Sequence, residues 1–205
     1  RASALLFAQA GARVALVDLR QPEVEAAAKA VRAAAGPDSA VAIVADLAQP
    51  EACSEAVANA IDAFGRLDVL FNNAGVGTVV VGGTVETISL EHWDLALDVN
   101  VRAMFLMSKA AVPHLRASGG GAIVNTGSVT GIQGSKNLLD YSMTKGGIHA
   151  FTRSLSAHLM PKGIRVNAVA PGPVWTPLNP SDKEAPQVAH FGEQVPMKRP
   201  AQPEE

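Results

Sequence analysis

The chain has 205 residues, 48% of them apolar, 18% charged and only 4% aromatic, and one hydrophobic core serves about 100 to 200 residues, so a single domain over residues 1–205 is expected. The net charge of −2, with Lys and Arg scattered singly, argues against nucleic acid or an anionic membrane surface as a partner. The single cysteine, Cys53, and five histidines without ligand spacing indicate neither disulfides nor a metal site, which favours a cytoplasmic protein with a small ligand.

The first ten residues, RASALLFAQA, resemble a secretion signal only superficially. Their apolar stretch from Ala4 to Ala8 is too short for the hydrophobic part of a signal peptide, and no later run reaches a membrane-spanning length. We therefore expect no membrane segment.

Five short runs rich in β-branched residues follow along the chain, and each is typical of a strand buried on both faces. They are RVALVDL (13–19), VAIVADL (41–47), LDVLFNNAG (67–75), GAIVNTGS (121–128) and IRVNAVAPG (164–172). Helical patterns lie between them, at 22–35 and 50–64, each beginning with proline and followed by glycine. This alternation predicts an α/β fold with a doubly wound, Rossmann-like parallel sheet.

Ligands of such sheets bind beyond the carboxyl ends of the strands. The five runs end in polar, glycine or proline residues, namely Asp18, Asp46, Asn72 to Gly75, Ser128 and Pro171-Gly172. Loops also begin at strand ends, which could explain any one of these residues. Together they indicate a binding rim.

The only tyrosine, Tyr141, lies four residues before Lys145 in YSMTKGG, a spacing that places both side chains on one face of a helix. A phenol has a pKa of about 10, and a nearby ammonium group would lower that pKa, so Tyr141 becomes a candidate general acid or base. Gly146 and Gly147 would let a ligand or helix approach closely. The ordinary alternative is an amphipathic tyrosine beside a solvated lysine.

Two more polar residues support a catalytic interpretation. Ser128 lies at a strand end, thirteen residues before Tyr141, where its hydroxyl could bond the same substrate oxygen. Asn100 falls on a helical stripe with Trp93, Leu97 and Met104, and an amide on an apolar stripe needs a hydrogen-bond partner.

The motifs NNAG (72–75), LDVNV with Asn100, NTGS with Ser128, YSMTK and PGPVWT, in this order and spacing, resemble the short-chain dehydrogenase/reductase family along almost the whole chain. The resemblance implies a catalytic tetrad of Asn100, Ser128, Tyr141 and Lys145. Tyr141 would exchange a proton with the substrate oxygen, and Ser128 would orient that oxygen. Lys145 would lower the tyrosine pKa and hold the nicotinamide ribose, while Asn100 would keep a water in a proton relay.

The resemblance also implies the cofactor contacts Asp18, Asp46, Leu47, Asn73, Ala74, Gly75, Tyr141, Lys145, Val174 and Thr176. Asp18 would bond the adenosine ribose hydroxyls and repel a 2′-phosphate, so NAD is expected rather than NADP. Arg20 could instead pair with such a phosphate. Both aspartates could also be ordinary helix-capping carboxylates.

These residues predict an oxidoreductase that interconverts a secondary alcohol and a ketone by hydride transfer. A non-catalytic NAD(H)-binding regulatory protein of the same fold is the alternative, which the complete tetrad disfavours. An epimerase or dehydratase is disfavoured because such relatives carry a longer substrate domain. The expected substrate is a small neutral alcohol or ketone, and its candidate lining is Val79 to Val81, Ile132, Trp175, Leu178 and Phe191.

The family pattern also bears on the ends of the chain and on assembly. Because members begin with a strand and a glycine-rich turn and finish with another strand, we expect this chain to lack its first and last strands. Residues 173–205, rich in proline and charge, are expected to form a mobile flap on the substrate side, or a disordered tail. Apolar helices at 100–115 and 141–160 predict a homodimer or homotetramer. Cys53 is expected to be inert, and His149 and His158 to face solvent or an interface.

Overall fold

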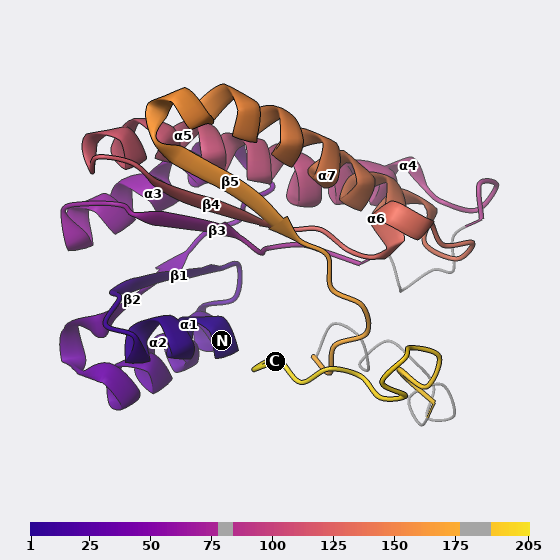
Figure 1. Ribbon diagram of the computed structural model, residues 1–205, viewed down its shortest axis with the longest axis horizontal. Helices are drawn as coiled ribbons and strands as arrows, with labels where there is room; N and C mark the ends of the chain where they lie inside the picture. Colours follow the sequence, from indigo (N-terminus) through magenta and orange to yellow (C-terminus); the bar gives the residue numbers. More distant parts are fainter. Residues whose placement is uncertain (78–83, 177–189) are drawn as a thin grey trace.

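The computed structural model describes residues 1–77, 84–176 and 190–205, and these form five parallel strands and seven α-helices (Figure 1). The strands are β1 (Val14–Asp18), β2 (Ala40–Val44), β3 (Val69–Asn72), β4 (Gly121–Thr126) and β5 (Ile164–Val169). The α-helices are α1 (Ala2–Gln9), α2 (Gln21–Ala35), α3 (Pro50–Phe64), α4 (Leu90–Leu97), α5 (Ala103–Ala117), α6 (Thr130–Gln133) and α7 (Leu139–Leu159). Every predicted strand run overlaps one of these strands, so the α/β, Rossmann-like fold is confirmed.

The strands form two parallel sheets rather than the single sheet that was expected. β1 pairs with β2, whereas β3, β4 and β5 pair in that order. Within the described ranges, no strand lies between β1 and β3 to join the two sheets. All pairs are parallel, so the carboxyl ends within each sheet share one edge, as the strand-end prediction requires.

Helices cover both faces of the β1–β2 sheet. α1 and α2 pack on one face through Ala8, Ala28 and Val31. On the other face, Ile43 joins a larger core with α3, α5 and the inner face of β3–β5, where Leu115 and Ile123 are fully buried. Each such side chain contributes about 1.5–3 kcal/mol of burial free energy. None of the described helices has the length and apolar character needed to cross a membrane.

Proline and glycine set the helix boundaries where the sequence indicates. α3 begins at Pro50, whose missing N–H would have no partner in the first turn. Gly65 ends it with a φ of +75°, a left-handed conformation that other residues rarely adopt.

The junction between α4 and α5 differs from the predicted continuous α-helical stripe. Asp98–Arg102 form a π-helical turn, and the Arg102 guanidinium pairs with Asp98 at 2.7 Å. A π turn is wider than an α turn, so the spacing of Trp93, Leu97, Asn100 and Met104 is not that of a regular α-helix. Such turns are common at functional sites, and Asn100 lies in this one with 1% of its surface exposed.

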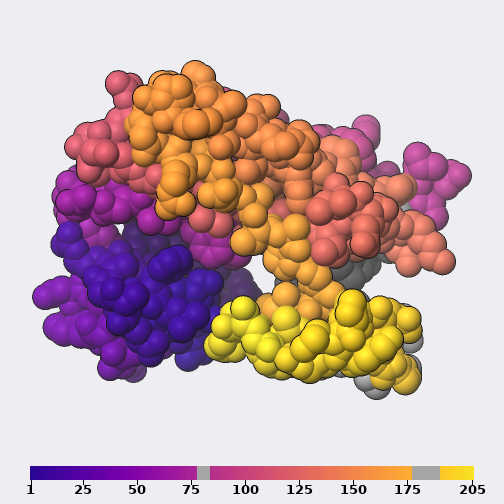
Figure 2. All heavy atoms as spheres, in the orientation of Figure 1, coloured from indigo at the N-terminus to yellow at the C-terminus, as the bar shows by residue number. Residues whose placement is uncertain are grey.

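The C-terminal residues fold back onto the chain just after β5. Val174 forms a parallel bridge with Ala201, the Trp175 N–H donates to the Ala201 carbonyl at 2.8 Å, and the Ala201 N–H donates to the Pro173 carbonyl at 2.9 Å. Figure 2 shows this yellow segment beside the indigo N-terminal helices, with an opening between it and the body above. Part of the predicted flap, residues 177–189, lies outside the described residues, so its mobility stays a prediction.

Candidate active site

Tyr141 and Lys145 lie on α7 as neighbours, as their spacing predicts. The Lys145 ammonium nitrogen is 5.4 Å from the centroid of the Tyr141 ring and donates a hydrogen bond to the Thr126 carbonyl at 2.8 Å. Only 3% of the lysine surface is exposed. The solvated-lysine alternative is therefore wrong.

The glycine after Lys145 lets another helix reach the backbone of α7. A Cβ atom on Gly131 of α6 would lie 2.6 Å from the Lys145 carbonyl carbon, and one on Gly146 would lie 3.3 Å from the Gly131 carbonyl oxygen. The predicted close approach at Gly146 is thus made by α6. A Cβ on Gly147 would meet nothing within 4 Å.

Ser128 follows β4 and is buried beside Tyr141. Its Oγ accepts hydrogen bonds from the Thr130 N–H at 3.2 Å and from the Thr130 hydroxyl at 3.0 Å. The Ser128 hydroxyl also favours ionisation of the Tyr141 phenol, since it acts to lower the pKa of that group. That Ser128 and Tyr141 act on the same substrate oxygen stays a prediction.

His149 was expected to face solvent or an interface, and its ring is half-buried with a contact that the expectation did not include. Its Nε2 accepts a hydrogen bond from the Ser128 N–H at 3.3 Å, and a Cβ on Gly127 would collide with its ring. Sequence spacing offered a weak signal: His149 lies eight residues after Tyr141 on the same helix, about two turns away.

Asn100 connects the rim after β3 to α7. Its Oδ1 accepts from the Val76 N–H at 2.8 Å, and its Nδ2 donates to the Val76 carbonyl at 3.0 Å and to Thr144 Oγ1 at 3.1 Å. A Cβ on Gly75 would lie 3.1 Å from Asn100 Oδ1 and 3.6 Å from Lys145 Nζ. The buried Asn100 amide thus has hydrogen-bond partners. Any side chain at position 75 would fill the space beside the Lys145 ammonium group, so glycine keeps that space open.

Burial sets the pKa values of the two central groups. It raises the pKa of the Tyr141 phenol, and the hydrogen bond from Ser128 opposes this in part. Burial also lowers the pKa of Lys145 to about 8. The expectation that the tyrosine pKa is lowered is thus wrong, because burial outweighs the effect of the neighbouring polar groups.

Asp18 and Asp46 lie together at the carboxyl end of the β1–β2 sheet, where the Ala45 N–H donates to the Asp18 carbonyl at 3.0 Å. The Asp18 carboxylate accepts from the Arg20 N–H at 3.0 Å, and the Asp46 carboxylate accepts from the Ala48 N–H at 3.0 Å. Each carboxylate therefore stabilises its own turn. Neither caps a helix, because the N-cap residues of α2 and α3 are Arg20 and Gln49, without a side-chain cap bond. Leu47 is partly buried and packs against the core.

The other predicted rim residues follow β3 and β5. Asn73, Ala74 and Gly75 are exposed, and Asn73 Oδ1 accepts from the Thr126 hydroxyl at 3.2 Å. Val174 and Thr176 lie in the short stretch that pairs with the C-terminal residues, and the Thr176 N–H donates to the Val174 carbonyl at 2.9 Å. Of the predicted substrate lining, Trp175 and Phe191 pack with ring centroids 6.1 Å apart and Ile132 is exposed, whereas Val79 to Val81 and Leu178 lie outside the described residues.

A buried polar network beneath the site escaped the sequence analysis. Asn72 Nδ2 donates to Asn125 Oδ1 at 2.9 Å and to Ser108 Oγ at 3.2 Å, and Asn125 Nδ2 donates to Thr152 Oγ1 at 2.9 Å. Asn72 and Asn125 are register partners in β3 and β4. The sequence signal that could have revealed this network is an asparagine inside each of two apolar strand runs, Asn72 and Asn125.

The open, polar rim fits an extended ligand better than a metal ion. No group of three or more His, Cys, Asp or Glu side chains gathers anywhere in the described part of the chain. The space that a Cβ on Gly75 would fill lies between the exposed rim and Lys145 Nζ, which suits a hydroxylated ligand reaching the lysine. The residues present therefore fit a nicotinamide dinucleotide.

Comparison with known proteins gives matches along the whole chain. The family model described as enoyl-(acyl carrier protein) reductase matches residues 1–205. A glucose and ribitol dehydrogenase from Daucus carota is 47% identical over 80% of this chain, which spans 55% of that protein. An NADPH-dependent aldehyde reductase 1 from Arabidopsis thaliana is 39% identical over 99% of the chain and 71% of its own length.

The fold is equally close to that of a solved structure. Levodione reductase superposes with a TM-score of 0.92 and 32% identity, over 99% of this chain and 81% of that one. With the matched motifs assembled around Tyr141 as described above, these similarities show that the chain belongs to the short-chain dehydrogenase/reductase family.

Proposed function

We propose that the protein is an oxidoreductase that transfers a hydride between a nicotinamide cofactor and a secondary alcohol or ketone. The observation that carries this proposal is the single tyrosine, which is half-buried and has the Lys145 ammonium nitrogen 5.4 Å from its ring centroid. The relatives support it, since their names describe dehydrogenases and reductases of carbonyl or hydroxyl compounds.

Tyr141 acts as the general acid in the reducing direction. Because burial raises its pKa, the phenol is protonated at neutral pH and its O–H is available to the substrate carbonyl oxygen. Ser128 donates a hydrogen bond to the same oxygen, keeps its proton, and stabilises the negative charge that develops there. A nicotinamide cofactor, when bound, would supply or accept the hydride.

Lys145 and Asn100 position the groups that surround the reacting oxygen. Lys145 would hold the nicotinamide ribose through the space left open at Gly75, and a ligand there would compete with its present bond to the Thr126 carbonyl. Asn100 fixes the turn at Val76 and, through Thr144, the first turn of α7, because Thr144 Oγ1 donates to the Tyr141 carbonyl at 2.8 Å. It thereby joins the turn after Gly75 to the first turn of α7.

NAD is the preferred cofactor in this proposal. The Asp18 carboxylate is exposed at the end of β1, where it would bond ribose hydroxyls and repel a 2′-phosphate. The Arg20 guanidinium pairs with Glu23 at 3.0 Å, so bonding a phosphate would require it to leave that carboxylate. The NADPH-dependent Arabidopsis relative shows that similar chains use the other cofactor, so the preference needs direct measurement.

The substrate is expected to be small, neutral and partly apolar. Trp175 and Phe191 form an aromatic pair beside the chain that leaves β5, and an aromatic wall favours an apolar portion of the substrate. Residues 173–205 would then act as the flap on the substrate side. Glucose, ribitol and levodione in the names of the relatives fit an uncharged hydroxyl or ketone compound.

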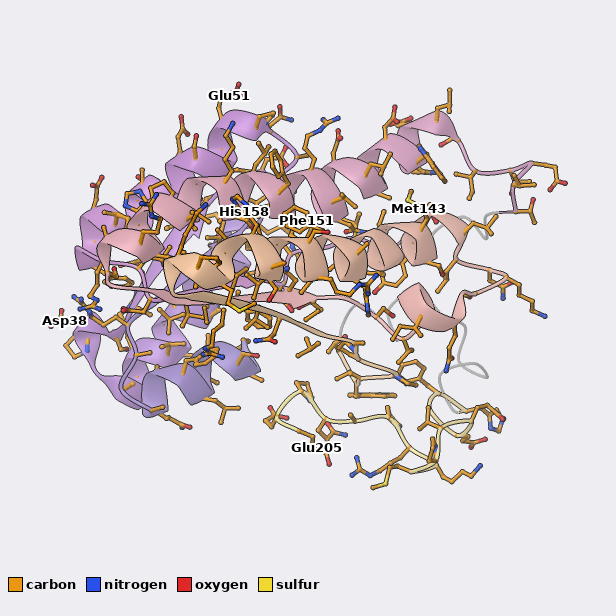
Figure 3. All side chains as sticks on the ribbon, turned by 45° about the horizontal axis from the view of Figure 1, so that its top comes forward. Asp38, Glu51, Met143, Phe151, His158 and Glu205 are labelled. Carbon is orange, nitrogen blue, oxygen red and sulfur yellow. The ribbon has the colours of Figure 1, made fainter. Side chains whose placement is uncertain are left out.

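A homodimer or homotetramer is proposed on the basis of the outer face of α5 and α7. The rings of Phe105 and Phe151 meet edge to face at 6.3 Å, and Met143 lies further along α7 (Figure 3). Phe105 and Met143 are 46% and 39% exposed, and a partner subunit on this face would bury these apolar side chains. Light scattering tests this proposal, and a strictly monomeric protein would contradict it.

The function is tested with a panel of secondary alcohols and ketones, each with NAD(H) and NADP(H), followed by nicotinamide absorbance. Activity on uncharged substrates, with NAD(H) the more efficient cofactor, is expected. Calorimetric titration with both cofactors accompanies the panel. Cofactor binding without turnover of any substrate would instead favour the regulatory alternative.

A further inference from the structure

The neighbours of Ser128 determine whether its hydroxyl can donate or accept a further hydrogen bond. A serine hydroxyl has one proton to donate and two lone pairs with which to accept. Thr130 occupies both lone pairs, one with its backbone N–H at 3.2 Å and one with its hydroxyl at 3.0 Å. The only unused capacity of Ser128 Oγ is therefore its proton. The Ser128 hydroxyl acts to lower the pKa of the Tyr141 phenol, as a donor toward the phenol oxygen would.

The backbone of Ser128 is anchored separately, by the helix that carries Tyr141. His149 Nε2 accepts a hydrogen bond from the Ser128 N–H at 3.3 Å. His149 and Tyr141 both belong to α7. Because this hydrogen bond joins the Ser128 backbone to α7, it fixes the distance between that backbone and Tyr141 on the same helix.

We propose that Thr130 and His149 are positioning residues that hold Ser128 as an obligatory hydrogen-bond donor toward the oxygen of Tyr141 and of the substrate. This inference rests on the proposed function for its catalytic meaning. Neither residue touches the reacting atoms. Thr130 sets the direction of the serine proton, and His149 sets the place from which it is donated.

Removing either hydrogen bond has a defined physical consequence. Without the Thr130 hydroxyl, one lone pair of Ser128 is free, so the serine can rotate and accept a hydrogen bond instead of donating one. A hydroxyl that accepts hydrogen bonds is polarised and becomes a stronger donor. Losing the bond from the Thr130 hydroxyl therefore also weakens the hydrogen bond that Ser128 donates. Because a donated hydrogen bond stabilises the phenolate, weaker donation makes Tyr141 harder to ionise.

The test uses the fact that Tyr141 is the only tyrosine in the chain, so phenolate absorbance reports on this site alone. Ionisation of Tyr141 is followed by rapid pH jump, before alkaline unfolding begins, in the wild type, Ser128→Ala, Thr130→Val and Thr130→Ser. We expect the ionisation constant to fall about 3- to 10-fold in Ser128→Ala and about threefold in Thr130→Val. Thr130→Ser keeps the hydroxyl and should stay within about twofold of the wild type.

His149 is tested in the same way with a matched pair. His149→Phe keeps a ring but removes the acceptor, whereas His149→Gln can present an oxygen to the Ser128 N–H. The Phe variant should shift the ionisation in the direction of Ser128→Ala, and the Gln variant should largely restore it. Urea denaturation of each variant checks that the fold is intact.

Wild-type ionisation in Thr130→Val and in His149→Phe would overturn the inference, as would an unshifted Ser128→Ala. The titration needs no turnover, so an inactive wild type would count against the proposed function and leave the titration result valid. With an active wild type, the turnover number of Thr130→Val should fall several-fold and that of Thr130→Ser should recover. The KM for the cofactor should not change in either variant.

Discussion

Replacing Lys145 with methionine should stabilise the protein while removing its proposed activity. The lysine is 3% exposed, and burial lowers its pKa from the usual 10.5 to about 8. Each pKa unit corresponds to about 1.4 kcal/mol, so holding the ammonium charged at neutral pH costs about 3 kcal/mol of folding free energy. Methionine has a similar length and carries no charge into the interior.

The hydrogen bond that the lysine makes opposes this gain. The Lys145 ammonium donates to the Thr126 carbonyl at 2.8 Å, and a buried acceptor left without its donor costs about 1 kcal/mol or more. The net expectation is that Lys145→Met raises the free energy of unfolding by about 2 kcal/mol at neutral pH.

The advantage of methionine should depend on pH with a definite sign. The unfolded lysine keeps its proton up to a pKa of 10.5, whereas the folded one loses it near pH 8. Between these values the unfolded state binds more protons, so the stability of the wild type rises with pH. The difference between Lys145→Met and the wild type must therefore shrink across this window.

The assay is urea denaturation of both proteins, without cofactor, at neutral pH and at several values up to the alkaline limit of the fold. Lys109→Met is the matched control, because Lys109 is exposed on α5 and its replacement removes the same charge from water. The control should change the unfolding free energy by less than about 0.5 kcal/mol at any pH. A Lys145→Met protein no more stable than the wild type, or a gain that persists unchanged at high pH, would refute the reasoning.

Three further substitutions probe the rim and the packing. Asp18→Ala should raise the efficiency with NADP relative to NAD, because it removes a carboxylate that repels the 2′-phosphate; an unchanged ratio in steady-state kinetics would contradict this role. Gly131→Ala should cost about 1–3 kcal/mol in urea denaturation, since its Cβ would lie 2.6 Å from the Lys145 carbonyl carbon, whereas the control Gly147→Ala has open space and should cost nothing. Asn100→Ala should cost about 2–4 kcal/mol by leaving Val76 and Thr144 without their partner, and a decrease below about 0.5 kcal/mol would count against the network.

Local sequence signals predicted the parts of the site that depend on one element. The spacing of Tyr141 and Lys145 fixes their common helix face, and Pro50 with Gly65 fixes the ends of α3. Ser128 was found because strand ends in parallel sheets share one edge. These features follow from the periods of helix and strand alone.

Other parts of the site depend on tertiary contacts, which the spacing of residues along the sequence does not reveal. The bond between His149 and Ser128 joins residues 21 positions apart, and the pair of Asn72 and Asn125 requires the register of two strands. The pKa of Tyr141 was expected to fall because an ammonium group is near, yet burial raises it. Desolvation is a property of the packed interior, so sequence distance to a charge could not predict its sign.

The most direct test of the proposed chemistry is the turnover of Tyr141→Phe on the best substrate of the panel, measured beside its cofactor affinity by calorimetry. The substitution removes one hydroxyl and keeps the ring near Lys145. We predict a decrease of about 100- to 10,000-fold in turnover number with nearly unchanged cofactor binding. A Phe variant that retains more than about a tenth of the wild-type rate would contradict the role of Tyr141 as the general acid and base.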